Sequence, residues 1–92
     1  DFYKVILKVY FLSEITVSIE QYFESLYWDN YRVLVHALKS TSLTIGAVSL
    51  SEKAKALEMA AKDGKEDYIL SHHREVMEDY KGLLNTLHEV LE

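Results

Sequence analysis

The segment YRVLVHALKSTSLTIG, residues 31–46, pairs an apolar sector with a polar face at the spacing of an α-helix. Each helical residue is turned by about 100° from the one before it, so residues three, four and seven positions apart share a side. The apolar sector contains Tyr31, Leu34, Val35, Leu38 and Ile45. His36 falls almost opposite this sector. The segment therefore predicts an amphipathic helix that buries one side and presents His36 to solvent.

The face around His36 carries positive charge. Arg32 and Lys39 lie on one flank of the histidine, because residues three and four positions apart are neighbours on a helix. Ser40 lies on the other flank, and Leu43 follows two turns along. An exposed imidazole beside two cations is a candidate reactive site.

The composition fits a single domain spanning residues 1–92. The chain has no run of about 18 apolar residues, so we expect a soluble domain without membrane contact. It has no cysteine, which excludes disulfides and thiolate metal sites and fits a cytoplasmic location. The formal net charge of −5 disfavours nucleic-acid binding, which needs a basic stripe.

The chain favours helices because it contains no proline and only three glycines. We expect a short helix from Phe2 to about Leu12 and a second helix near residues 13–27. Alternation and β-branched residues between positions 5 and 19 would also allow a β-hairpin. The helix that carries His36 is expected to begin at Asp29, as its N-cap, and to end near Ile45.

Two further helices are expected after Gly46. Ser49 and Glu52 have the spacing of a capping box, which predicts a helix that ends before Gly64. From about residue 66 to 91, apolar residues recur at a spacing near 3.5, with His73 among them, which predicts the longest helix and a core or boundary histidine. These amphipathic segments indicate an all-α fold, an antiparallel up-down four-helix bundle with a short additional N-terminal helix.

The residues around His36 also resemble a known family. The pattern His36-x-Leu38-Lys39, a small residue at Ser40, Ser42 and the pair Ile45-Gly46 resembles the active-site signature of histidine phosphotransfer (HPt) domains. The later pair Leu57-Glu58 and the total length extend this resemblance over nearly the whole chain. The resemblance, and not the periodicity, favours helices over a hairpin between residues 2 and 27. It implies one HPt domain, of the kind that would be excised from a larger hybrid sensor histidine kinase. The family most often has glycine where this chain has Ser40.

The resemblance implies a role for each residue of the segment. His36 would accept a phosphoryl group on Nε2, and Lys39 would stabilise the charge that develops there. Ser40 would donate a hydrogen bond to the phosphoryl oxygens, and Ser42 and Gly46 would support the site. Arg32 and the exposed Leu43 would help a partner to dock.

The implied partners are receiver domains. The donor would be an aspartyl phosphate on the receiver of a hybrid histidine kinase, and the acceptor would be a response regulator. We expect no cofactor of its own, because the chain lacks a phosphate-binding glycine-rich loop. We also expect the domain to be a monomer. Mg²⁺ would belong to the receiver. We expect no metal site at His72 and His73, which point about 100° apart on a helix.

Two other functions remain compatible with the sequence. Ser40 keeps open an HPt-like interaction module that binds receiver domains without carrying phosphate. The chain would also fit the phosphoacceptor domain of a chemotaxis-type kinase, which uses the same fold and histidine but takes phosphate from ATP through a separate catalytic domain.

Overall fold

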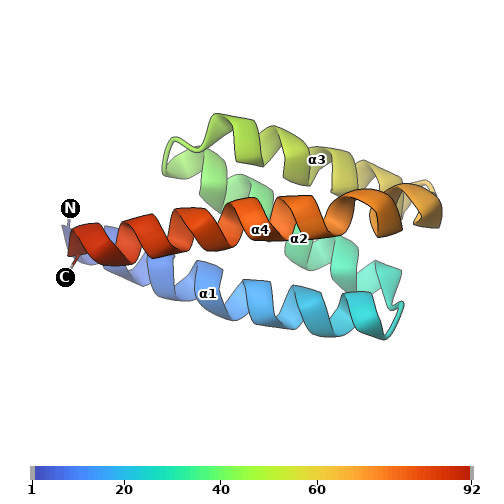
Figure 1. Cartoon of the computed structure of the whole chain (residues 1–92), viewed down its shortest axis with the longest axis horizontal. Helices are drawn as coiled ribbons and strands as arrows, with labels where there is room; N and C mark the ends of the chain where they lie inside the picture. Colours follow the sequence, from blue (N-terminus) through green and yellow to red (C-terminus); the bar gives the residue numbers. More distant parts are fainter. Residues whose placement is uncertain (1, 92) are drawn as a thin grey trace.

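The computed structural model describes residues 2–91, apart from the side chains of residues 2, 3, 5, 8, 9, 88, 90 and 91. Within this range the chain forms four helices and no strand, so the predicted all-α class is confirmed (Figure 1). The helices are α1 (Phe2–Glu24), α2 (Trp28–Thr44), α3 (Val48–Lys62) and α4 (Glu66–Leu91). The hairpin that the pattern also allowed does not form in the described residues.

Each helix lies against two others. α2 packs between α1 and α3, and α4 closes the arrangement by packing against both α3 and α1. Figure 1 shows that the chain turns back at each connection, so that α1 begins and α4 ends at the same end of the molecule. The molecule is elongated, with extents of 39 × 22 × 19 Å. α2 and α3 run side by side, so side chains of these two helices can contact each other.

The predicted break near residue 12 is wrong, because α1 is one continuous helix. A helix ends where glycine, proline or a cap interrupts its hydrogen bonds, and residues 2–24 contain no glycine or proline. The buried residues Leu12, Ile15 and Ile19 form one stripe at helical spacing. Because the stripe continues past residue 13, no separate short helix covers the end of the bundle in the part of the chain described.

The predicted starts of α2 and α3 are also wrong. Tyr27 is the N-cap residue of α2, so Asp29 lies inside the first turn. Its carboxylate still suits the positive end of the helix dipole. Ala47 is the N-cap residue of α3, so Ser49 lies within the helix and does not open it. Both starts are set by the tight turn that precedes them.

Three connections share one geometry. Leu26, Gly46 and Gly64 have positive φ angles of 60°, 87° and 70°, each just beyond the end of a helix. The amide of the next residue then donates back to the helix, as from Ala47 N to Ser42 O at 2.8 Å. This pairing is the Schellman motif, in which glycine is the usual residue at positive φ. The sequence predicted the two glycine turns but not the turn at a leucine.

This geometry predicts opposite effects of substitution at Leu26 and Gly64. Leu26→Gly should raise the free energy of unfolding by about 0.5 kcal/mol, because relieving the left-handed backbone outweighs the entropy of a glycine in the unfolded chain. Leu26 is 54% exposed, so little burial is lost. Gly64→Ala should lower the free energy of unfolding by about 1 kcal/mol. Urea unfolding measures both, and a destabilised Leu26→Gly variant would refute the strain at this turn.

The core contains a polar chain that joins three helices. Tyr31 of α2 lies with its hydroxyl 2.8 Å from His73 Nδ1, and His73 Nε2 lies 2.5 Å from Glu20 Oε1 of α1. Phe23 stacks on the imidazole with ring centroids 3.8 Å apart. His73 is only 2% exposed, so its predicted position in the core or at its boundary is confirmed.

The state of His73 follows from this environment. Burial, together with the positive charges of Arg74 and Lys81, lowers the pKa of His73 although the Glu20 carboxylate raises it. The neutral ring satisfies both partners, because its Nε2–H donates to Glu20 and its Nδ1 accepts from the hydroxyl of Tyr31. Burial also raises the pKa of Tyr31, so the hydroxyl keeps its proton. This network fixes how α1, α2 and α4 meet.

Candidate functional site

His36 projects from the exposed side of α2. The buried residues Tyr31, Val35 and Leu38 hold the opposite side of the helix against the core. The turn of about 100° from Val35 to His36 brings the imidazole to the surface. Its side chain is 57% exposed, as the sequence pattern predicts.

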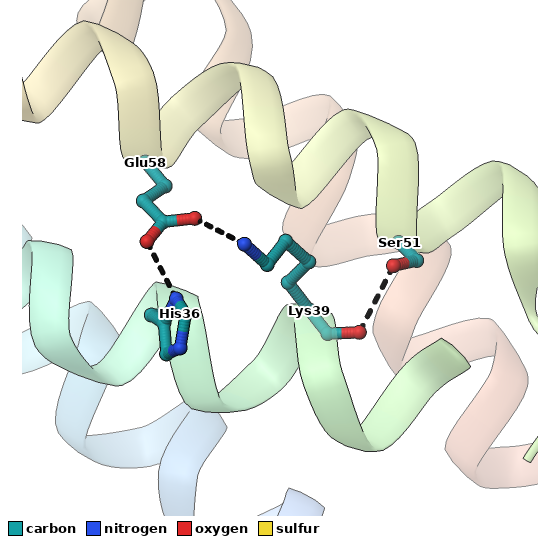
Figure 2. Close-up of polar contacts among 4 residues, drawn as sticks. All are labelled: His36, Lys39, Ser51 and Glu58. Atoms are coloured by element: carbon teal, nitrogen blue, oxygen red, sulfur yellow. Dashed lines mark hydrogen bonds and ion pairs between the residues drawn. The ribbon is translucent and has the colours of Figure 1, made fainter. Parts of the chain in front are cut away.

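Glu58 of α3 reaches across to two of the predicted site residues (Figure 2). Its Oε2 lies 2.6 Å from His36 Nδ1, and its Oε1 lies 2.7 Å from Lys39 Nζ. The Glu58 and Lys39 side chains are 18% and 23% exposed, so this bridge is much less open to solvent than the imidazole. One carboxylate therefore holds both the histidine and the lysine.

A second contact fixes the same part of α2 on α3. The Ser51 hydroxyl of α3 donates to the backbone carbonyl of Lys39 at 2.9 Å (Figure 2). Ser51 is buried, so the contact is shielded from water. The register of the two helices is thus defined beside His36, which limits how far Glu58 can move from the imidazole.

The charge on Glu58 determines which ring nitrogen of His36 is free. Partial burial raises the pKa of Glu58, but the hydrogen bonds from Lys39 and His36 and the electrostatic attraction to these two residues together bring the pKa below its ordinary value. The carboxylate is therefore ionised near neutral pH and only accepts hydrogen bonds. The proton of the neutral imidazole must then be on Nδ1. Nε2 keeps its lone pair and lies on the side of the ring away from Glu58 (Figure 2).

We predict that Glu58→Gln weakens this preference. Losing a charge-assisted hydrogen bond of roughly 1.5 kcal/mol should change the ratio of the two His36 tautomers by about tenfold. The ¹⁵N chemical shifts of the His36 ring measure this ratio, with Glu52→Gln as the control on the exposed side of α3. A wild-type ring protonated mainly on Nε2 would contradict the assignment.

Three other predicted residues share the face of His36. Ser40 is exposed one turn along, and its carbonyl accepts a hydrogen bond from the hydroxyl of Thr44 at 3.0 Å. Leu43 is exposed further along the same face. Arg32 lines a shallow hollow of about 210 Å³ together with His36, Glu58 and Val33. The predicted polar face is therefore one surface of α2.

Ser42 and Gly46 are not brought to this surface. Ser42 is fully buried, with its Oγ 2.7 Å from the Leu38 carbonyl oxygen and 2.7 Å from the Tyr80 hydroxyl oxygen. It links α2 to α4 inside the core. Gly46 lies at the end of α2 with a φ of 87°, and a Cβ there would meet nothing within 4 Å. Its contribution is the turn between α2 and α3.

The sequence did not predict two features next to the site. Glu58 was named only as part of the family resemblance, and its contacts with His36 and Lys39 were not predicted. It directly follows Leu57, a buried residue of α3. Leu7 and Phe11 of α1 line a second hollow of about 370 Å³ with three residues of α2, Ser40, Thr41 and Thr44. Leu7 and Phe11 are each about half exposed. An apolar edge therefore flanks the polar face.

The chain matches no protein-family model, no curated protein and no solved structure. None of the helices, over the residues that the structure describes, combines the length and the apolar character needed to cross a membrane. Across the same residues, no three histidine, aspartate or glutamate side chains are grouped to hold a metal ion.

Proposed function

We propose that this chain is a histidine phosphotransfer domain. His36 accepts a phosphoryl group from an aspartyl phosphate on one receiver domain and passes it to the receiver of a response regulator. The observation that carries the proposal is the 2.6 Å contact of Glu58 with His36 Nδ1, which leaves Nε2 free on an exposed ring. The alternating course of the four helices fits the rigid up-down bundle expected of such a domain (Figure 1).

In the proposed step the imidazole of His36 supplies the attacking lone pair. Nε2 of His36 attacks the phosphorus, the bond from phosphorus to the aspartate oxygen breaks, and its electron pair returns to the aspartate carboxylate. The ring keeps its proton on Nδ1 and gains a positive charge, which the Glu58 carboxylate stabilises. Attack by the next aspartate on the same phosphorus reverses these changes and frees the imidazole.

The partner supplies the remaining chemistry. Mg²⁺ belongs to the acidic pocket of the receiver, and the domain needs no cofactor of its own. The exposed Leu43 and Val33 lie on the face of His36 and offer apolar contact to a docking receiver. In this proposal the domain acts as a monomer in the cytoplasm. It phosphorylates nothing from ATP, so any kinase activity belongs to other domains.

One observation favours the second candidate, a phosphate-free module that binds receivers. Ser40 is exposed one turn from His36, where the family most often has glycine. Its hydroxymethyl group narrows the approach to the ring. A serine is small enough to leave Nε2 accessible, so we prefer the phosphotransfer function.

The test is transfer from a panel of phosphorylated receiver domains to the purified domain. We expect phosphate on the domain that is labile to acid and stable to alkali, as a phosphorus–nitrogen bond requires. Binding of several receivers without any such label would favour the phosphate-free module. Ser40→Gly would then show whether the serine blocks the reaction.

A further inference from the structure

Two cations were predicted beside His36, but the structure places them in different environments. Lys39 Nζ lies 2.7 Å from Glu58 Oε1 and is only 23% exposed, so this cation already has a partner. Arg32 lies one turn before His36 and is half-buried. Among the described residues, its guanidinium forms no ion pair and no side-chain hydrogen bond.

Arg32 and His36 line the same hollow on the surface of the molecule. Arg32, Val33, His36 and Glu58 line this space of about 210 Å³. Residues four apart on a helix are neighbours, so the guanidinium and the imidazole are presented on the same side of α2. A phosphoryl group on the exposed ring of His36 is therefore one helical turn from the Arg32 side chain.

The guanidinium of Arg32 can balance the negative charge that the phosphorylated site would carry. A phosphorylated ring that keeps its Nδ1 proton carries one positive charge, and Glu58 and Lys39 neutralise each other. The phosphoryl group adds two negative charges. The site is then left with one excess negative charge unless Arg32 contributes. A guanidinium also presents paired N–H donors that match two phosphoryl oxygens.

We propose that the Arg32 guanidinium contacts the phosphoryl oxygens on His36 during and after transfer, so that Arg32 is a catalytic residue in addition to any part in docking. This inference rests on the proposed function. Lys39 then acts through Glu58, as a positioning residue that keeps the carboxylate in place against Nδ1.

The test separates a contact with the phosphoryl group from a contact with the receiver protein. The receiver that labels the wild type fastest is used over a range of concentrations in rapid-quench experiments. Arg32→Gln should lower the rate constant at saturating receiver by at least about tenfold, since a charged donor to the transferring group is lost. The half-saturating concentration should change by less than about twofold, and Arg32→Lys should restore part of the rate.

Arg74→Gln is the matched control, because it removes an exposed arginine from α4 and should leave both constants unchanged. A second measurement follows the ³¹P chemical shift of the phosphorylated domain against pH. Loss of the guanidinium should move the protonation midpoint of the phosphoryl group to higher pH in Arg32→Gln. Thermal melting of each variant establishes that the fold is intact.

The possible results distinguish two failures. If no receiver labels the wild type, the proposed function is wrong and the role of Arg32 fails with it. If the wild type is labelled but Arg32→Gln changes only the half-saturating concentration, Arg32 is a docking residue. An unchanged ³¹P midpoint in that variant would likewise overturn the contact while leaving phosphotransfer at His36 in place.

Discussion

His36→Gln is expected to abolish phosphoryl transfer and to leave the fold intact. The imidazole is the only group at this face with a free nitrogen lone pair in the described structure, so the transfer rate should fall by more than about 1000-fold. The side chain is 57% exposed, so the free energy of unfolding should change by about 1 kcal/mol or less. Transfer assays and urea unfolding of the same variant measure the two effects.

His72→Gln is the control for this substitution. His72 lies on α4, with its Nδ1 2.9 Å from the Tyr68 carbonyl oxygen and its ring stacked on Tyr68. It is a second partly exposed histidine, away from α2, and the substitution should leave transfer unchanged. If His36→Gln retained the label while His72→Gln lost it, the phosphoacceptor would be His72 of α4 and not His36 of α2. If His36→Gln unfolded the domain, the exposed position of His36 would be wrong.

His73→Ala is expected to have the largest effect on stability. The substitution leaves a cavity beside Phe23 and removes the partner of the buried Tyr31 hydroxyl. It also removes the contact of His73 Nε2 with Glu20 of α1, which keeps its ion pair with Lys81 of α4 at 3.6 Å. The sum of a cavity and an unsatisfied hydroxyl predicts a loss of about 3 kcal/mol in the free energy of unfolding.

Urea unfolding measures this loss, and two variants show its origin. Tyr31→Phe removes the hydroxyl, so it should cost about 1 kcal/mol alone and should make His73→Ala less harmful in the double variant. His72→Ala is the matched control on the neighbouring position and should cost much less. Equal losses for His72→Ala and His73→Ala would mean that the chain from Tyr31 to Glu20 does not stabilise the bundle.

The sequence predicted the helices better than their ends. Apolar periodicity identifies a helix over many residues, and it located α2, α3 and α4. Ends depend on a few local contacts. Asp29 and Ser49 looked like caps, but the turns at positive φ that precede them set the starts of α2 and α3. Leu26 could not be predicted in such a turn, because leucine rarely takes this conformation.

Only the part of the site that lies on α2 could be predicted from the sequence. The turn of about 100° per residue placed His36, Lys39 and Ser40 on one face. The same geometry could have placed Ser42 in the core, because it lies four residues after the buried Leu38. The bridge through Glu58 was not predictable from spacing, since it depends on the register between α2 and α3.

NMR of the phosphorylated domain tests most directly whether His36 carries the phosphoryl group on Nε2. The domain is labelled with ¹⁵N-histidine, incubated with a phosphorylated receiver, and examined for coupling between ³¹P and the ring nitrogens. We expect phosphorus bonded to Nε2 of His36, with the proton still on Nδ1. Phosphorus on Nδ1, on another side chain, or on no residue with any receiver tested would contradict it.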